Sequence, residues 1–270
     1  PVGETLAPID TYFTVLGDDA DLALLAAAQA DFVRARIAGT ALADLPLLSA
    51  AAPFLAGGRG GPEAYTDIPA GPLAMRDLAA LYPYPNAVCA VRMTGADIVA
   101  WLERAAGLFA RIDPAERGPQ ILRDRLFPSY HFDMIRGLGY AIDPTQPSRF
   151  DRDGGLVDPQ ARRVRDIVFD GRPLRDDDVF LVATNTYRAG GGGRFCGGRL
   201  EMAFTSTTLV REALRDFVAA AGPLRLADRL TWRLDLPAGC EILYATGPGA
   251  AGREPPGLAL EDRGIDADGY

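Results

Sequence analysis

Residues 47–62 read Leu-Leu-Ser-Ala-Ala-Ala-Pro-Phe-Leu-Ala-Gly-Gly-Arg-Gly-Gly-Pro, and the rest of the chain can be interpreted outward from this stretch. Its first part, 47–54, is a short apolar run that predicts a buried strand. Its second part, 56–62, is a glycine-rich loop in which the backbone can approach a ligand closely. An arginine between glycines can donate to a phosphate or carboxylate, so Arg59 with its neighbour Gly58 is a candidate ligand contact. The alternative is a flexible surface loop with a solvated arginine.

A second segment combines aromatic rings with prolines. Residues 81–86 read Leu-Tyr-Pro-Tyr-Pro-Asn, and the prolines fix φ and hold the neighbouring tyrosines outside regular structure. The ring of Tyr84 beside the amide of Asn86 suits a planar ligand that forms hydrogen bonds, such as a nucleobase. The alternative is a core tyrosine at the entrance of a strand, which these residues taken alone favour.

A third segment joins a strand to a run of glycines. The apolar residues Val179–Asn185 predict a buried strand, which leads into Tyr187, Arg188 and the four glycines 190–193. An aromatic ring and an arginine at a strand end are typical of ligand-binding loops, and a mobile loop is the alternative. The pattern GxGxxG can be fitted here. No helix is expected to open at that point and no strand–helix–strand unit surrounds it, so a dinucleotide site is not predicted.

The remaining patterns predict one α+β, or mixed α/β, body with mixed sheets, packed helices and a leading helix. The leading helix is amphipathic and spans 18–38, with Asp18 as its cap. Asp-Gly at 170–171 supplies the positive φ of a tight hairpin turn. Further strands are expected at 88–93, 164–169, 172–174, 231–236 and 241–246, and a strand or hairpin limb at 130–143. Further helices are expected at 95–108, capped by Thr94 with Asp97 in the capping box, and at 208–221, closed by Gly222.

Composition restricts the chemistry. The 28 basic residues are all arginine, and the single histidine is His131. The chain therefore offers no lysine for a P-loop or a Schiff base, and no set of imidazoles for a metal cage. A catalytic triad with histidine would need His131. A lone histidine in the aromatic stretch 130–133 is more often a structural or surface residue.

Charge restricts the partners. A net charge of −8 and an isoelectric point near 4.8 argue against a general nucleic-acid-binding protein, which needs a basic face. A few well-placed arginines can still hold a small anion. Without lysine, any cationic side chain on a phosphate must be an arginine, and Arg59 is the first candidate and Arg188 the next. The three cysteines are widely spaced and match neither a disulfide framework nor a zinc pattern.

Several long strings resemble the C-terminal domain of the bacterial 2′,3′-cyclic-nucleotide 2′-phosphodiesterase/3′-nucleotidases, within the broader 5′-nucleotidase family. They are residues 48–54 with the loop that follows, residues 81–86, residues 140–151 and residues 180–189. Their order is preserved from the leading helix to about residue 246. The resemblance implies the fold of a 5′-nucleotidase C-terminal domain.

The resemblance also implies a pocket in which two aromatic rings sandwich a nucleobase. Tyr84 and Tyr187 stand at the matching positions, and Asn86 matches an amide near the base. Arg59, in the loop that also holds Gly58, is the implied contact to the substrate phosphate.

The chain departs from the 5′-nucleotidase pattern at one point. That pattern places an Asp after the second aromatic residue to hold the ribose, whereas residues 190–193 here are all glycine. The implied activity is hydrolysis of 2′,3′-cyclic nucleotides to 3′-nucleotides and dephosphorylation of 3′-nucleotides. The alternatives are the specificity domain of a 5′-nucleotidase or UDP-sugar hydrolase, and a nucleotide-binding module without catalysis.

A two-domain parent follows from the same resemblance. Residues 1–40 would be the interdomain connector with its linker helix, and residues 41–270 the nucleotide-specificity domain. Because the chain begins at Pro1 without Met, we expect a processed product or a fragment. An N-terminal metallophosphoesterase domain with two divalent metal ions would lie outside it and carry the catalytic residues. The expected partners are a nucleotide or nucleoside and that domain, with no nucleic acid polymer and no membrane, and the resemblance places the parent in the periplasm.

Overall fold

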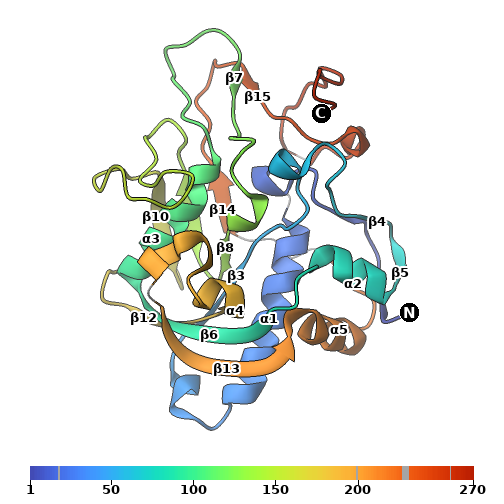
Figure 1. Ribbon diagram of the computed structural model, residues 1–270, viewed down its shortest axis with the longest axis vertical. Coiled ribbons are helices and arrows are strands. Elements are labelled where there is room, and N and C mark those ends of the chain that lie inside the picture. Colours follow the sequence, from blue (N-terminus) through green and yellow to red (C-terminus); the bar gives the residue numbers. More distant parts are fainter. Residues whose placement is uncertain (18, 199, 227–230, 256) are drawn as a thin grey trace.

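A five-stranded sheet forms the centre of the computed structural model, which describes residues 1–17, 19–198, 200–226, 231–255 and 257–270 (Figure 1). The strand order is β13-β6-β12-β3-β8, in which β3 and β12 are parallel and every other neighbouring pair is antiparallel. The strands are β13 (Glu201–Leu209), β6 (Ala87–Thr94), β12 (Val179–Asn185), β3 (Leu47–Ala51) and β8 (Met134–Arg136).

A second sheet of four strands has the order β11-β10-β9-β14, and three two-stranded ribbons complete the strands of the described residues. The strands of the second sheet are β11 (Arg172–Pro173), β10 (Val164–Phe169), β9 (Gly139–Ile142) and β14 (Thr231–Leu234). The ribbons pair β1 (Gly3–Thr5) with β5 (Gly71–Leu73), β2 (Ile9–Asp10) with β4 (Asp67–Ile68), and β7 (Gln120–Ile121) with β15 (Ile242–Leu243).

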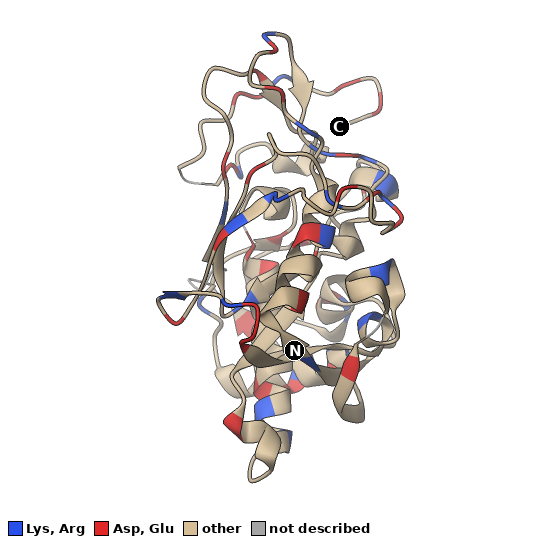
Figure 2. Ribbon diagram, turned by 90° about the vertical axis from the view of Figure 1, so that its left-hand side faces the viewer, with Lys and Arg blue, Asp and Glu red and all other residues tan. Residues whose placement is uncertain are grey.

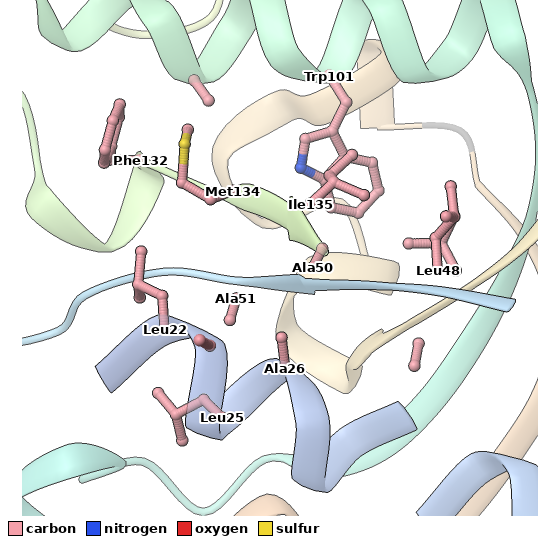
Figure 3. Close-up of a cluster of buried hydrophobic side chains, with 14 of the residues drawn as sticks. Leu22, Leu25, Ala26, Leu48, Ala50, Ala51, Trp101, Phe132, Met134 and Ile135 are labelled. Carbon is pink, nitrogen blue, oxygen red and sulfur yellow. The ribbon is translucent and has the colours of Figure 1, made fainter. Parts of the chain in front are cut away.

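Helices cover both faces of the central sheet. Figure 3 shows β3 between Leu22, Leu25 and Ala26 of α1 on one side and Trp101 of α3 on the other. The expected fold class is confirmed by this mixture of sheets and packed helices. The helices are α1 (Ala20–Ile37), α2 (Met75–Leu81), α3 (Gly95–Ala105), α4 (Thr186–Ala189) and α5 (Val210–Ala221).

The leading helix is more deeply buried than a one-sided amphipathic stripe predicts. It packs against β3 on one side and α5 on the other, so that even Leu24 and Ala28 are buried. Asp31 and Arg34 face solvent. The predicted cap, Asp18, lies outside the described residues. Helix α1 is thus part of the core of this body, and the interdomain role of residues 1–40 remains a prediction.

Local sequence signals predict several boundaries well. The capping box of α3 is present: the Thr94 hydroxyl accepts from the Asp97 amide at 3.2 Å, and the Asp97 carboxylate accepts from the Thr94 amide at 2.9 Å. The β10–β11 turn has positive φ at Asp170 (49°) and Gly171 (75°), which is the signature of a type I′ turn. Helix α5 is followed by Gly222, as predicted.

Two expectations are wrong in detail. Residues 130–143 form no single strand, because the chain leaves the central sheet after β8, turns at Gly137 (φ 101°) and enters the second sheet as β9. The sequence patterns do not predict strand β13. Because Leu209 at its end still pairs with Ala87, the helix expected from Thr208 begins at Val210. Strand β13 is half exposed at a sheet edge, so its residues lack the apolar alternation that reveals a buried strand.

The acidic first turn of α1 contains a buried carboxyl group. Asp21 is 2% exposed and accepts a hydrogen bond from the Thr14 hydroxyl at 2.9 Å. Burial raises the pKa of Asp21 to about 8, against the lowering effect of the Thr14 hydrogen bond. The folded chain therefore holds a proton here between roughly pH 4 and pH 8, where the unfolded chain has released it.

We predict that Asp21→Asn flattens the dependence of stability on pH. In the wild type, the contribution of the Asp21 carboxyl to the free energy of unfolding is fully present below about pH 4 and is lost as the pH rises through about 8. Asparagine keeps the acceptor for Thr14 and removes the titration. Melting temperatures measured from pH 5 to pH 9 should fall more steeply with rising pH for the wild type than for the variant. Parallel curves would contradict a buried neutral Asp21.

Candidate functional site

The strand directions bring three segments to the same end of the central sheet. They are the glycine-rich loop 56–62, the segment 81–86 and the loop that follows β12. Because β3 and β12 are parallel, the loops that follow both strands leave from the same edge. Strand β6 is antiparallel to β12, and Asn185 at the end of β12 lies opposite Val88 near the start of β6. The segment 81–86, which precedes β6, therefore meets the loops that follow β3 and β12.

Tyr84 and Tyr187 are both half exposed at this edge. Each residue is 44% exposed, although both adjoin buried strands. Tyr84 stands edge-on to Phe54, with ring centroids 5.4 Å apart, and to Tyr130 at 6.5 Å. The ring of Tyr187 lies so close to Gly192 that an added Cβ there would be 2.5 Å from the ring carbons. The glycine is therefore needed for the position of the ring.

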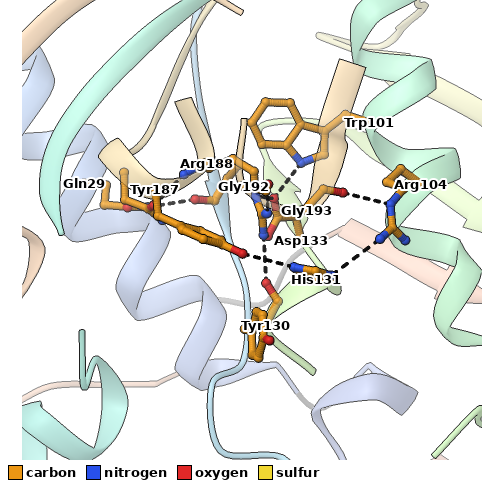
Figure 4. A network of polar contacts seen from close by, with 12 residues as sticks. Gln29, Trp101, Arg104, Tyr130, His131, Asp133, Tyr187, Arg188, Gly192 and Gly193 are labelled. Atoms are coloured by element: carbon orange, nitrogen blue, oxygen red, sulfur yellow. Dashed lines mark hydrogen bonds and ion pairs between the residues drawn. The ribbon is translucent and has the colours of Figure 1, made fainter. Parts of the chain in front are cut away.

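Tyr130 and His131 connect the two tyrosines. Their rings are 4.7 Å apart, Tyr130 contacts Tyr84, and His131 Nε2 lies 3.4 Å from the hydroxyl of Tyr187 (Figure 4). The tyrosine sites chosen from the sequence thus belong to one continuous aromatic cluster.

A buried ion pair between Arg188 and Asp133 lies next to this cluster. Arg188 Nε lies 2.7 Å from Asp133 Oδ2 and Nη2 lies 2.9 Å from Oδ1, and the two side chains are 3% and 5% exposed. Asp133 also accepts a hydrogen bond from the indole of Trp101 at 2.8 Å (Figure 4). The remaining Arg188 donors reach the backbone carbonyls of Tyr130 and Gly192. These contacts favour an architectural role for Arg188 over the phosphate contact expected from the sequence.

The contacts of His131 favour one tautomer. Arg104 Nη2 lies 3.5 Å from Nδ1, and because a guanidinium can only donate, Nδ1 must accept. The proton therefore belongs on Nε2, where it points to the Tyr187 hydroxyl oxygen, whose own hydrogen remains available to a ligand. Burial lowers the pKa of His131 to about 3, and the charges of Arg188, Arg104 and Arg59 add to the effect.

Arg59 lies on an exposed turn beside the same cluster. Gly57 and Gly58 have φ of 63° and 61°, and an added Cβ on Gly58 would be 2.6 Å from Arg123 Nη2, so the backbone rests directly on a buried guanidinium. Within the described part of the chain, Arg59 has no hydrogen bond or ion pair, yet its charge contributes to the lowered pKa of His131. Arg59 is therefore an exposed cation whose charge reaches His131.

Segment 81–86 divides into a structural tyrosine and an exposed one. Tyr82 is 2% exposed, so the interpretation as a core tyrosine at a strand entrance holds for it and not for Tyr84. The amide of Asn86 donates to the Tyr82 hydroxyl at 3.2 Å, which fixes that amide two residues from the exposed ring.

Arg104 and Asp133 both support the site, although no sequence motif singles them out. Each is a charged residue inside an apolar stretch, and a buried charge requires a partner. The sequence therefore indicates that Arg104 and Asp133 need partners. It does not show that the partner of Asp133 is Arg188, which is 55 positions away.

The described residues offer no cluster of metal ligands. Among them, no group of three or more His, Cys, Asp or Glu side chains could hold a metal ion. These side chains do not fit a two-metal centre. No described helix is both long and apolar enough to cross a bilayer. Acidic and basic residues are interspersed along the ribbon (Figure 2).

The family described as "5′-nucleotidase, C-terminal domain" matches residues 6–197, so the chain belongs to this family. It is 38% identical over 260 residues to the 2′,3′-cyclic-nucleotide 2′-phosphodiesterase/3′-nucleotidase of Salmonella typhimurium (strain LT2), covering 92% of this chain and 40% of that protein. It is 42% identical over 195 residues to the trifunctional nucleotide phosphoesterase protein YfkN of Bacillus subtilis (strain 168), covering 72% of this chain and 13% of that protein.

Solved structures support the same fold. A putative 5′-nucleotidase from Staphylococcus aureus, solved with α-ketoglutarate, has a TM-score of 0.64 at 17% identity and matches 87% of this chain and 41% of its own. A 5′-nucleotidase precursor from Thermus thermophilus has a TM-score of 0.53 at 17% identity and matches 90% of this chain and 39% of its own. The chain thus spans at most about two fifths of each relative named here.

We predict that Arg188→Met destabilises the fold by about 3–5 kcal/mol, because it leaves the buried Asp133 carboxylate without its partner. The control is Arg165→Met, which removes a pair with Asp235 in which the arginine is 49% exposed and which should contribute at most about 1 kcal/mol. Urea denaturation measures both. Equal, small losses would contradict the architectural role of Arg188.

We predict that His131 remains neutral throughout the physiological range. Because it is the only histidine of the chain, its ring signals in NMR spectra of a protein without a histidine tag need no further assignment. The ring should show the Nε2–H tautomer and no titration between pH 8 and pH 5, since its pKa is about 3. A midpoint near the ordinary value of about 6.5 would show that the ring is not held as described.

Proposed function

We propose that this chain is the substrate-binding domain of a phosphoesterase that cleaves 2′,3′-cyclic nucleotides to 3′-nucleotides and then removes the 3′-phosphate. The support is of two kinds. The chain belongs to the 5′-nucleotidase C-terminal-domain family, and the Salmonella relative that matches 92% of it carries this activity in its name. One observation carries the binding role: two half-exposed tyrosines from separate loops belong to one aromatic cluster, and the charge of the exposed Arg59 acts on His131 of that cluster.

In this proposal the nucleobase stacks between Tyr84 and Tyr187. Stacking on an aromatic ring contributes roughly 1–3 kcal/mol per base and tolerates any base, because every base has an aromatic face. The amide of Asn86 and the free hydrogen of the Tyr187 hydroxyl are the adjacent hydrogen-bonding groups. This combination suits an enzyme that accepts several nucleotides.

The phosphate is assigned to Arg59. A guanidinium can donate two parallel hydrogen bonds to phosphate oxygens, and Arg59 is exposed on a glycine turn where a ligand can approach the backbone. Residues 190–193 are all glycine and carry no carboxylate, so we assign no ribose contact to that loop.

The bond-breaking chemistry is assigned to an N-terminal metallophosphoesterase domain of the parent, which would supply two divalent metal ions. Residues 1–40 would connect that domain to this one, and we place the parent in the periplasm. The residues described here would bind and orient the nucleotide, and no proton-transfer step is assigned to them. Neutral His131 would hold the Tyr187 hydroxyl as a hydrogen-bond acceptor.

We predict that Tyr84→Ala and Tyr187→Ala each weaken adenosine binding by about 5- to 100-fold, the loss expected from one stacking surface. Calorimetric titration of the 270-residue chain measures this. The controls are Tyr84→Phe and Tyr187→Phe, which keep the rings and should stay within a few-fold of the wild type. Unchanged affinity for adenosine in both alanine variants would contradict the stacking of the base between Tyr84 and Tyr187.

Substrate class is tested separately, with the full-length product of the gene that encodes this chain. Hydrolysis of 2′,3′-cyclic AMP and 3′-AMP should exceed hydrolysis of 5′-AMP. A preference for 5′-AMP would instead favour a 5′-nucleotidase, and binding without hydrolysis of any of the three would favour a non-catalytic nucleotide-binding module.

A further inference from the structure

Residues 266–270, Asp-Ala-Asp-Gly-Tyr, fold into a compact turn, called the Tyr270 turn below. Asp266 Oδ1 accepts hydrogen bonds from the amides of Asp268 at 2.9 Å and Tyr270 at 3.0 Å. The Asp266 amide donates to the Tyr270 carbonyl at 2.7 Å. The turn is thus held together by its own carboxylate and backbone.

A single arginine anchors the Tyr270 turn to the body. Arg125 Nη2 lies 2.5 Å from Asp266 Oδ2, Nη1 lies 2.6 Å from Asp268 Oδ2, and the guanidinium carbon lies 4.7 Å from the centre of the Tyr270 ring. Hydrogen bonds from Arg125 and from the turn backbone lower the pKa of Asp266. One guanidinium therefore fixes two carboxylates and one ring.

The anchored ring reaches the glycine-rich loop. The Tyr270 hydroxyl donates to the carbonyl oxygen of Gly58 at 2.6 Å. Beside it, an added Cβ on Gly269 would be 3.2 Å from Pro62 of the same loop. On the buried side, Arg123 donates to the carbonyl of Ala56. The loop is therefore held between the Tyr270 turn and a buried arginine.

This support matters because the loop consists mostly of glycine, although backbone hydrogen bonds also form within it. Four of the five residues 57–61 are glycine, and glycine loses more backbone freedom on ordering than any other residue. The carbonyl that Tyr270 holds belongs to Gly58, and Arg59 is the next residue. Fixing that peptide group before a ligand arrives removes an ordering cost from binding.

We propose that Tyr270 is a positioning residue for Arg59 and that its hydroxyl preorganises the loop for the phosphate of a bound nucleotide. The inference deepens the proposed function and rests on it for the ligand class. It assigns a role to residues that lie outside the stretch matched by the family, which ends at residue 197. The Tyr270 hydroxyl should strengthen the binding of ligands that carry a phosphate and leave the binding of nucleosides unchanged.

The test uses Tyr270→Phe in the 270-residue chain. Hydrogen exchange should become faster at the amides of Gly60 and Gly61, which donate within the loop to Gly57 and Gly58. Titration with 3′-AMP should show about 2- to 10-fold weaker binding, the effect of one hydrogen bond, while adenosine binding stays within about 2-fold. Arg59→Ala should show the same selectivity, and the double variant should lose little more than Arg59→Ala alone.

A matched control is Arg263→Ala, which removes a pair with Glu241 near the Tyr270 turn without touching the loop. It should alter neither measurement. Unchanged loop exchange in Tyr270→Phe, or equal losses for 3′-AMP and adenosine, would overturn the positioning role. If the wild type binds neither ligand, the proposed function fails and the phosphate role with it, whereas the exchange data still decide whether Tyr270 orders the loop.

Discussion

The ion pair between Arg188 and Asp133 is the contact on which the rest of the site depends. It joins α4, which follows β12, to the residue immediately before β8, and both side chains are almost fully buried. Two charges in such a place are stable only with good geometry and further hydrogen bonds, and Trp101 and two backbone carbonyls supply these. Because Arg188 follows Tyr187 directly, the pair also fixes where the exposed ring can stand.

The same pair explains the electrostatics of the surface above it. Asp133 neutralises Arg188 only in part, and Arg104 and Arg59 add positive charge around His131. A histidine in this field remains neutral, so it serves as a hydrogen-bond relay from Arg104 to Tyr187. A chain with net charge −8 thus places three arginines around its single histidine.

The parts of the fold and site that depend on local chemistry could be predicted from the sequence, whereas those that depend on contacts between distant residues could not. Strand β12, the Thr94 capping box and the turn at 170–171 follow from propensity and spacing alone. Asp133 and Arg188 find each other only in the folded sheet, and Arg188 therefore looked available for a ligand. Residues 266–270 contain no regular element, so nothing in their pattern connects them to the glycine-rich loop.

The parallel pairing of β3 with β12 has a consequence for how the chain acquires its site. Leu47 and Leu181 are partners in the ladder, yet about 130 residues separate them along the chain. Pairings of this kind form late, because a long loop must close before any contact rewards it. Tyr84 leaves the ribosome roughly a hundred residues before Tyr187, so the two tyrosines can come together only after both segments have been made. The cluster that contains Tyr84 and Tyr187 therefore forms only with the completed sheet.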